Sequence, residues 1–191
     1  MARSRFEIAT FNLYNLNRPG HRIYSDLDGW SDEQYAAKRD WTAGVLQRVN
    51  ADAYGFQELW HGQALSDVFE AAGLSADYDL LIPENHEGQR IACAGAVRKG
   101  LLVGEPEWIE DFPENFQLSA NGDDPQTPRV EVTLNAFSRP VLHYRIQPRQ
   151  GIFFEQFIVL FQQCIGKADT TQAQIFAQHE LHPVLPVDSE L

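Results

Sequence analysis

The chain has 191 residues, 43% of them hydrophobic and 12% aromatic, which suits one folded domain with an ordinary core. Its 27 acidic residues outnumber its 15 basic residues and give a formal net charge of −12. The composition excludes a disordered, collagenous or disulfide-scaffold chain. The charge argues weakly against long nucleic acid as a partner, because affinity for a phosphate backbone comes mainly from Lys and Arg.

The sequence indicates a cytoplasmic protein that does not contact a membrane. The N-terminal residues lack the apolar stretch of a signal peptide. The most apolar region, residues 151–161, contains Glu and Gln and is too short to span a bilayer. Cys93 and Cys164 are far apart and form no metal motif, so we expect free, buried thiols.

The first half of the chain alternates predicted strands and helices. Residues 5–12 place apolar side chains on both faces, which predicts a strand buried on both sides. Ser31 begins a capping-box pattern, so we expect a helix over residues 31–49. A short strand over residues 53–57 and a helix over residues 63–72 follow. The predicted apolar stripe of the first helix consists of Tyr35, Trp41, Val45, Leu46 and Val49.

The remaining residues up to 146 are predicted to be mostly strands, so the fold class is α/β: a partial two-layer β-sandwich with flanking helices. The core should include Phe6, Ile8, Phe11, Tyr54, Phe56, Ala94, Ala96, Val141 and Leu142. Further strands are expected over residues 78–82, 90–98, 101–108, 130–135 and 139–146, with an exposed loop over residues 113–128.

Two segments of this pattern contain polar residues, Asn12 in the first and Glu58 in the second, that suit metal-dependent chemistry. The first is Ala-Thr-Phe-Asn-Leu-Tyr-Asn-Leu over residues 9–16, and the second is Ala-Asp-Ala-Tyr-Gly-Phe-Gln-Glu-Leu over residues 51–59. Together with the helix between them, they resemble the start of the endonuclease/exonuclease/phosphatase family. The segments Ala-Cys-Ala-Gly-Ala-Val-Arg at 92–98 and Phe-Ser-Arg-Pro-Val-Leu at 137–142 resemble later core strands of that family.

The resemblance implies a metal-dependent phosphoesterase that hydrolyses phosphodiester or phosphomonoester bonds. By the family pattern, Glu58 is the glutamate that binds Mg²⁺ or Mn²⁺, and Asn12 is the asparagine beside the metal that orients a water or a phosphate oxygen. Mg²⁺ in proteins uses few carboxylates and keeps several waters, which suits one glutamate at a strand end. By themselves, an Asn after a strand is usually a turn residue and a Glu there is usually a solvated acid.

The resemblance covers residues 5–146, the N-terminal half of such a domain, and residues 147–191 differ in character. The family's catalytic His, its Asp-x-Asn motif and its closing Asp-His pair are not found after Arg145. We therefore interpret 147–191 as a divergent tail, helical or poorly folded, and expect a truncated protein with little or no activity. Phe154, Phe157, Ile158, Phe161 and Ile165 have helical spacing.

Two alternatives remain open at this stage: a non-catalytic α/β remnant or binding module, and an unrelated acidic structural domain. A structure that placed Asn12 far from Glu58 would favour the second. His179 and His182 have a spacing that can bind a metal, but Pro183 ends any helix there. His61 is close to Glu58 in the chain, although a surface histidine is the simpler interpretation, and Tyr14, Asn15 and Lys38 are interpreted as loop and packing residues.

Overall fold

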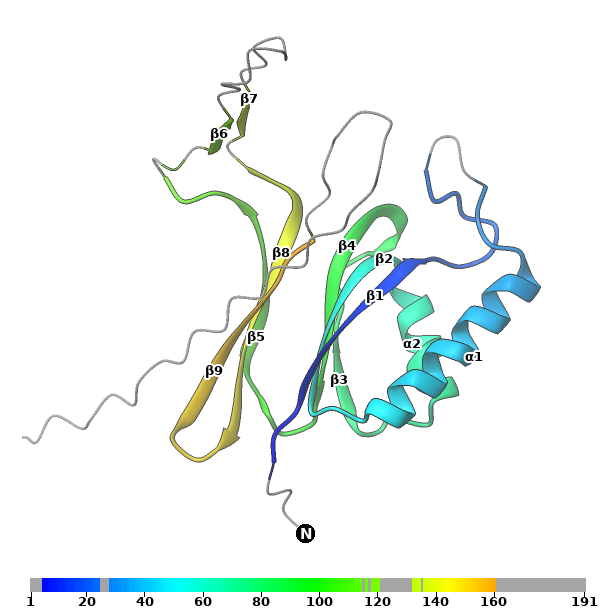
Figure 1. Ribbon diagram of the computed structural model, residues 1–191, viewed down its shortest axis with the longest axis horizontal. Helices are drawn as coiled ribbons and strands as arrows, with labels where there is room; N and C mark the ends of the chain where they lie inside the picture. The colour runs from blue at the N-terminus through cyan, green and yellow to red at the C-terminus, as the bar shows by residue number, and fades with distance from the viewer. Residues whose placement is uncertain are drawn as a thin grey trace, which may run out of the picture.

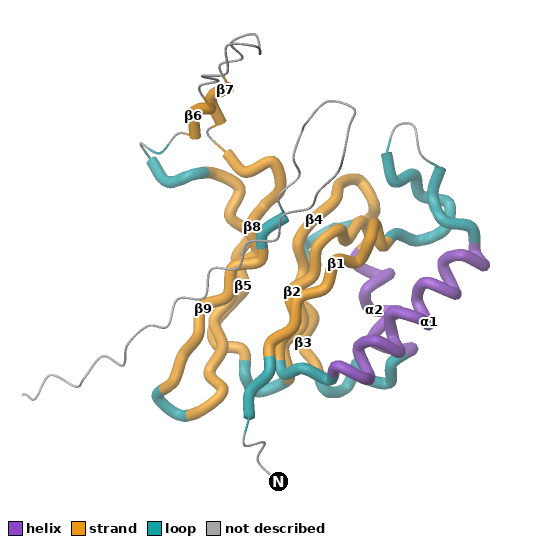
Figure 2. Tube along the Cα trace, viewed as in Figure 1, coloured by secondary structure: helices purple, strands orange, loops and turns teal. Residues whose placement is uncertain are grey.

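Two β-sheets face each other, and two helices cover the outer face of the first sheet (Figure 1). Figure 2 shows the helices gathered on one side of the molecule, with strands on the other. This arrangement confirms the predicted α/β class and the sandwich with flanking helices. The computed structural model describes residues 5–24, 28–114, 116, 118–120, 132–134 and 136–160.

The first sheet has the strand order β1-β2-β4-β3. Its two N-terminal strands are parallel, with Ile8 beside Ala53 and Asn12 beside Gln57, and the other pairs are antiparallel. The parallel arrangement requires a crossover, which the first helix provides. The strands are β1 (Ile8–Leu16), β2 (Ala53–His61), β3 (Tyr78–Leu81) and β4 (Glu87–Arg98).

Both predicted helices are present, as α1 (Asp32–Val49) and α2 (Gly62–Ala71). Ser31 and Gln34 form the expected capping box at the start of α1. The predicted apolar stripe of α1 is partly wrong, because Trp41 is 62% exposed and Val49 is 45% exposed. Thr42 and Ala43 are buried on this helix instead. Trp41 lies over the ring of Phe11, with 6.0 Å between ring centroids.

The second sheet corrects the prediction for the start of the tail. Its order is β5-β8-β9, with β5 (Leu102–Asp111), β8 (Ala136–Arg149) and β9 (Ile152–Ile158). Residues 152–158 form a strand and not the first turns of a helix, because they pair with β8 across a tight turn in which Gly151 has a φ of +78°. The sequence change at residue 147 lies within β8, and the division of the chain at residue 146 stays a prediction.

A shorter hairpin lies apart from the sandwich (Figure 1). The hairpin consists of β6 (Leu118–Ala120) and β7 (Val132–Leu134), so part of the predicted loop over residues 113–128 is a strand. Phe116 is 51% exposed, as expected for that loop. The rest of the loop, together with Cys164, His179 and His182, lies outside the described residues.

The two sheets pack through a shared apolar layer. Leu142, Tyr144 and Ile146 of β8 are fully buried against β4 and β2. Gly55 on β2 allows a close approach, because a Cβ atom there would lie 2.2 Å from Cδ1 of Ile158 on β9. Cys93 is a buried free thiol in this layer, as predicted, and burial raises its pKa to about 12.

A second apolar layer lies between the first sheet and the helices. Tyr54 and Phe56 of β2 are buried there, and their rings stack with 5.5 Å between centroids.

The predicted core is confirmed for six residues and overestimated for three. Phe6, Ile8 and Phe11 are only half-buried, because β1 is at the edge of its sheet. The six buried residues are Tyr54, Phe56, Ala94, Ala96, Val141 and Leu142.

Arg98 fastens the end of β4 to the start of β2. Its guanidinium donates hydrogen bonds to Asp52 Oδ1 (3.1 Å), Asn50 Oδ1 (2.8 Å) and Tyr78 Oη (2.8 Å), and it lies over the Tyr78 ring. Asp52 is 4% exposed. A buried carboxylate needs such partners, so this cluster is structural.

None of the helices in the described part of the chain is long and apolar enough to cross a membrane.

Candidate functional site

The site lies where the regular pairing of β1 and β2 ends. The strands pair residue by residue up to Asn12 and Gln57, and the register then shifts before Leu16 pairs with Leu59. Glu58 is the next residue on β2, so the two predicted residues belong to adjacent parallel strands. This adjacency removes the reason for preferring an unrelated structural domain, which required Asn12 to lie far from Glu58.

Glu58 is buried, with 7% of its surface exposed, and hydrogen-bond donors from β1 hold its carboxylate. The Asn12 Nδ2–H donates to Glu58 Oε1 at 3.0 Å, and the Asn15 backbone N–H donates to Oε2 at 3.2 Å. Each carboxylate oxygen therefore has a fixed neighbour. Such bonds fix the orientation of the group.

Asn12 uses both ends of its amide within the protein. Its Oδ1 accepts a hydrogen bond from the Tyr14 backbone N–H at 2.7 Å while its Nδ2 donates to Glu58. This arrangement makes Asn12 a positioning residue for the Glu58 carboxylate. The role of Asn12 as a metal ligand or a phosphate contact stays a prediction.

The backbone around these side chains is strained. Tyr14, Asn15 and Glu58 have φ values of 49°, 55° and 61°, which lie in the left-handed region that residues other than Gly seldom adopt. Each such residue costs on the order of 1–3 kcal/mol, less for Asn, and persists only where its surroundings hold it. The left-handed φ at Glu58 interrupts the pairing of β2.

Asn15 is held from several sides. Its Oδ1 accepts hydrogen bonds from Trp60 Nε1 (2.9 Å) and Tyr24 Oη (3.4 Å), and its backbone oxygen accepts one from Trp30 Nε1 (2.8 Å). Indole and phenol donors from a loop, from β2 and from the approach to α1 therefore meet at one residue. The interpretation of Asn15 as a loop residue misses its role, because its partners are distant in the sequence.

Lys38 of α1 reaches the same region. Its Nζ lies 5.1 Å from the centroids of both the Tyr14 and the Trp30 rings, which is within the range of cation–π attraction. Burial lowers the pKa of Lys38, and the negative charge of Glu58 opposes that change. The interpretation of Lys38 as a packing residue therefore overlooks its electrostatic interaction with the Glu58 carboxylate.

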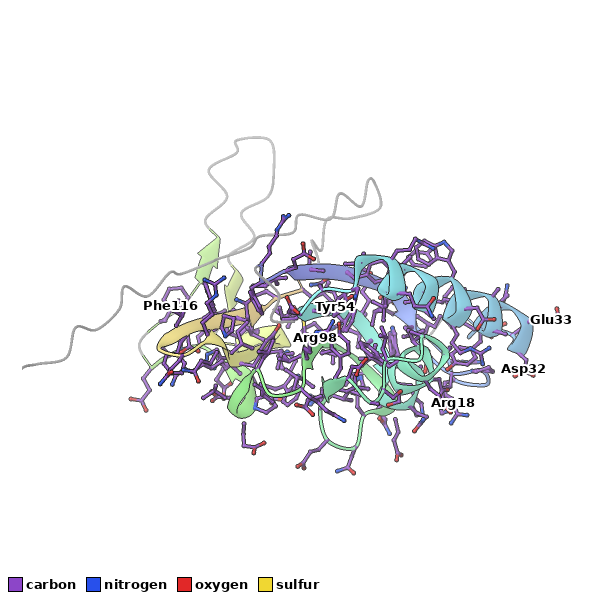
Figure 3. The ribbon with its side chains drawn as sticks, turned by 90° about the horizontal axis from the view of Figure 1, so that it is seen from below. Arg18, Asp32, Glu33, Tyr54, Arg98 and Phe116 are labelled. Carbon is purple, nitrogen blue, oxygen red and sulfur yellow. The ribbon has the colours of Figure 1, made fainter. Side chains whose placement is uncertain are left out.

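His61 is beside the site but is used in folding. Its Nδ1 accepts a hydrogen bond from the Gln63 backbone N–H at 3.1 Å, which caps α2, and its ring meets that of His21 edge-on at 5.2 Å. Burial, followed by the charges of His21 and Arg18, lowers the pKa of His61. Figure 3 shows Arg18 at the same end of the molecule as the start of α1, away from Phe116.

The described residues around Glu58 do not form an all-protein metal cage, but one oriented carboxylate is compatible with a Mg²⁺ or Mn²⁺ ion. Among the described residues, no three His, Cys, Asp or Glu side chains are grouped as metal ligands. One oriented carboxylate is nevertheless the kind of ligand that Mg²⁺ uses when waters and substrate phosphates complete its octahedron. Glu58 would hold such an ion, with Asn12 fixing the carboxylate.

A second polar cluster lies on the second sheet. His143 Nε2 is 2.8 Å from Glu155 Oε2, and Arg145 also donates to this carboxylate. Burial alone would raise the pKa of Glu155, but the hydrogen bonds from Arg145 and His143 lower it. This cluster joins β8 to β9 and does not reach Glu58.

No family model matches the sequence, and no curated protein is similar to it. Solved structures are similar to it over 80% of its length. Two of them are endonuclease/exonuclease/phosphatase family proteins, from Bacteroides thetaiotaomicron (16% identity, TM-score 0.44, 49% of that chain) and Bacteroides vulgatus (14% identity, TM-score 0.41, 47% of that chain). A third is a mannosyl-6-phosphatase from Bacteroides thetaiotaomicron (16% identity, TM-score 0.36, 49% of that chain). The chain spans about half the length of these proteins, and similarity at this level leaves its function to be argued from the site.

Proposed function

We propose that the chain is a metal-dependent phosphoesterase of the endonuclease/exonuclease/phosphatase type, in which Glu58 binds Mg²⁺ or Mn²⁺ next to a phosphoester. The observation that carries this proposal is the buried Glu58 carboxylate, held by Asn12 at 3.0 Å and by the Asn15 N–H at 3.2 Å on a left-handed backbone. Strain and burial of a charged group are costly. They are typical of sites where geometry serves a ligand.

The residues divide the work in a definite way. A divalent ion, when bound, neutralises charge on a non-bridging phosphate oxygen. Glu58 supplies its carboxylate ligand, and Asn12 keeps both oxygens of that carboxylate from rotating freely. The Asn15 amide, fixed through Trp60 and Trp30, supports the other oxygen.

The proposal includes weak turnover by this chain, because no residue is assigned to activate water. General base catalysis contributes about 10²–10⁴-fold, and a lost donor to the developing charge costs about 10²–10³-fold more. The family's His and Asp-His motifs are not found after Arg145. His61 does not replace them, because its Nδ1 accepts the hydrogen bond that caps α2.

The alternative function is a non-catalytic module that binds a metal ion and a phosphoester. The sequence feature favouring it is that the family's His and Asp-His motifs, which would activate water, are not found after Arg145. Such a module would bind the same ligands through Glu58 without turnover.

The test is hydrolysis of bis(p-nitrophenyl) phosphate by the full chain with Mg²⁺ or Mn²⁺, alongside Glu58→Gln and the matched variant Glu70→Gln, which changes an exposed residue of α2. We expect slow metal-dependent hydrolysis that Glu58→Gln removes and Glu70→Gln preserves. Metal binding through Glu58 without any hydrolysis would favour the binding module. Hydrolysis or metal binding that survives Glu58→Gln would refute both. Fast turnover lost in Glu58→Gln would refute the assignment of weak activity and direct attention to His179 and His182.

A further inference from the structure

Lys38 contacts two aromatic residues, Tyr14 and Trp30, which are hydrogen-bonded to Asn12 and Asn15, the two residues that hold the Glu58 carboxylate. Its ammonium is 5.1 Å from the ring centroids of both Tyr14 and Trp30. Trp30 is anchored, because it donates its indole N–H to the Asn15 backbone oxygen at 2.8 Å, and the Tyr14 ring lies 6.3 Å from the Trp30 ring. The two rings restrict the positions open to the Lys38 ammonium, whereas an exposed lysine usually samples many rotamers.

The same position makes the ammonium dependent on anions. Burial lowers the pKa of Lys38, and the charge that opposes this change comes from Glu58. Aromatic faces attract a cation but carry no net charge, so they offset only part of the lost hydration. The negative charge of Glu58 thus helps to stabilise the charged form of Lys38.

A divalent cation at Glu58 would reverse the sign of the electrostatic interaction at Lys38. The net local charge next to Lys38 would change from negative to positive, and the ammonium would be repelled where it had been attracted. A phosphate group restores the balance, because its oxygens accept hydrogen bonds from an ammonium and its charge is attracted by both cations. Sulfate-like anions share this chemistry, but a phosphoester is the ligand that the metal site would present.

We propose that Lys38 binds a phosphate oxygen of the ligand at Glu58, and that its charge acts in opposite directions on the two ligands: against the metal ion and in favour of the phosphate. This inference rests on the proposed function, since it requires a divalent cation at Glu58. It assigns Lys38 the role of a phosphate-binding residue, and it assigns Tyr14 and Trp30 the role of holding its ammonium in place. It also explains why Tyr14, which is 67% exposed, is kept in a left-handed conformation beside the site.

The proposal predicts that removing Lys38 has opposite effects on the affinities for the metal ion and for phosphate. Without phosphate, the positive charge of Lys38 repels a metal ion at Glu58, so the removal of Lys38 should tighten metal binding. With metal bound, Lys38 attracts phosphate, so its removal should weaken phosphate binding. A merely structural lysine would change both affinities in the same direction or neither.

The experiment is calorimetric titration of the full chain with Mn²⁺ alone, and with methyl phosphate in the absence and presence of Mn²⁺. Lys38→Met keeps a flexible apolar stem against the two rings and removes the charge. Lys99→Met makes the same chemical change at an exposed residue on the β4–β5 turn. Thermal melting of each variant verifies that it is folded.

In the parent chain and in Lys99→Met, we expect Mn²⁺ to tighten methyl phosphate binding on the order of tenfold. In Lys38→Met, Mn²⁺ alone should bind more tightly than in the parent, and methyl phosphate should bind the Mn²⁺-loaded protein on the order of tenfold more weakly than it binds the Mn²⁺-loaded parent. An unchanged affinity of Mn²⁺-loaded Lys38→Met for methyl phosphate would overturn the inference while leaving the proposed function intact. Mn²⁺ binding that persists in Glu58→Gln would instead remove the proposed function and this inference with it.

Discussion

Gly55 and Ile158 provide a direct test of how the second sheet packs on the first. A Cβ atom at Gly55 would lie 2.2 Å from Ile158 Cδ1, about 1.3 Å closer than ordinary carbon–carbon contact. Gly55→Ala must therefore push Ile158 aside or separate the sheets. Overpacking of this kind costs about 1–3 kcal/mol of unfolding free energy.

Removing the obstructing methyl should relieve that cost. Ile158→Val deletes Cδ1 and should lower stability by about 0.5–1.5 kcal/mol on its own. In the double variant the next contact, to Cγ1 at 3.0 Å, is tight but needs only a small shift. We expect the double variant to be more stable than the sum of the single effects implies, with a coupling of about 1–2 kcal/mol.

Urea denaturation of the four proteins in this cycle measures the coupling. Gly44→Ala is the matched control, since its Cβ would meet only the tip of Arg48 at 3.4 Å inside α1. It should raise stability by about 0.5–1 kcal/mol, as expected for Gly in a helix. Additive effects at Gly55 and Ile158, within about 0.5 kcal/mol, would refute the packing of β9 on β2.

Three further predictions concern the core, the site and acid stability. Phe56→Ala should lower the unfolding free energy by about 3–5 kcal/mol because Phe56 is fully buried, whereas Phe116→Ala, at a residue 51% exposed, should change it little in urea denaturation. Asn12→Asp places a second carboxylate where the amide lies 3.0 Å from Glu58, so the melting temperature at pH 7 should fall and Mn²⁺ should restore it; no restoration would contradict a metal site. Burial lowers the pKa of His86 from 6.5, so the unfolded chain takes up a proton first as the pH falls below 6.5, and stability should decline from there toward the lowered pKa. His86→Gln should flatten that part of a stability–pH curve, and an unchanged slope would exclude His86 as its cause.

Local patterns predict most of the first sheet and its helices. The capping box at Ser31 and the apolar residues of β2 depend on neighbours in the chain, and both are found in the structure. The side-chain contact between Asn12 and Glu58 follows from two parallel strands joined by a helix, because the carboxyl ends of such strands share an edge. These features need little information from distant residues.

Tertiary contacts decide the features that the patterns miss. Phe154, Phe157 and Ile158 have a spacing that suits a helix, yet Phe154 and Ile158 share one face of a strand because β8 is available as a partner. Trp41 packs on Phe11, but Phe11 belongs to the edge strand β1, so the indole is covered on one side only and stays exposed. The left-handed Glu58 has no signal in the sequence, since such positions usually carry Gly.

The central claim is that Glu58 binds a divalent cation, and the most direct measurement of it is a titration of the ¹⁵N-labelled chain with Mn²⁺ followed by NMR. A paramagnetic ion broadens the resonances of nearby amides, so a specific site is distinguished from loose binding to a chain of net charge −12. We predict that sub-stoichiometric Mn²⁺ broadens the amides of Tyr14, Asn15 and Glu58 first, and that this selectivity disappears in Glu58→Gln. Broadening spread over the acidic surface, or the same selective broadening in Glu58→Gln, would contradict the claim.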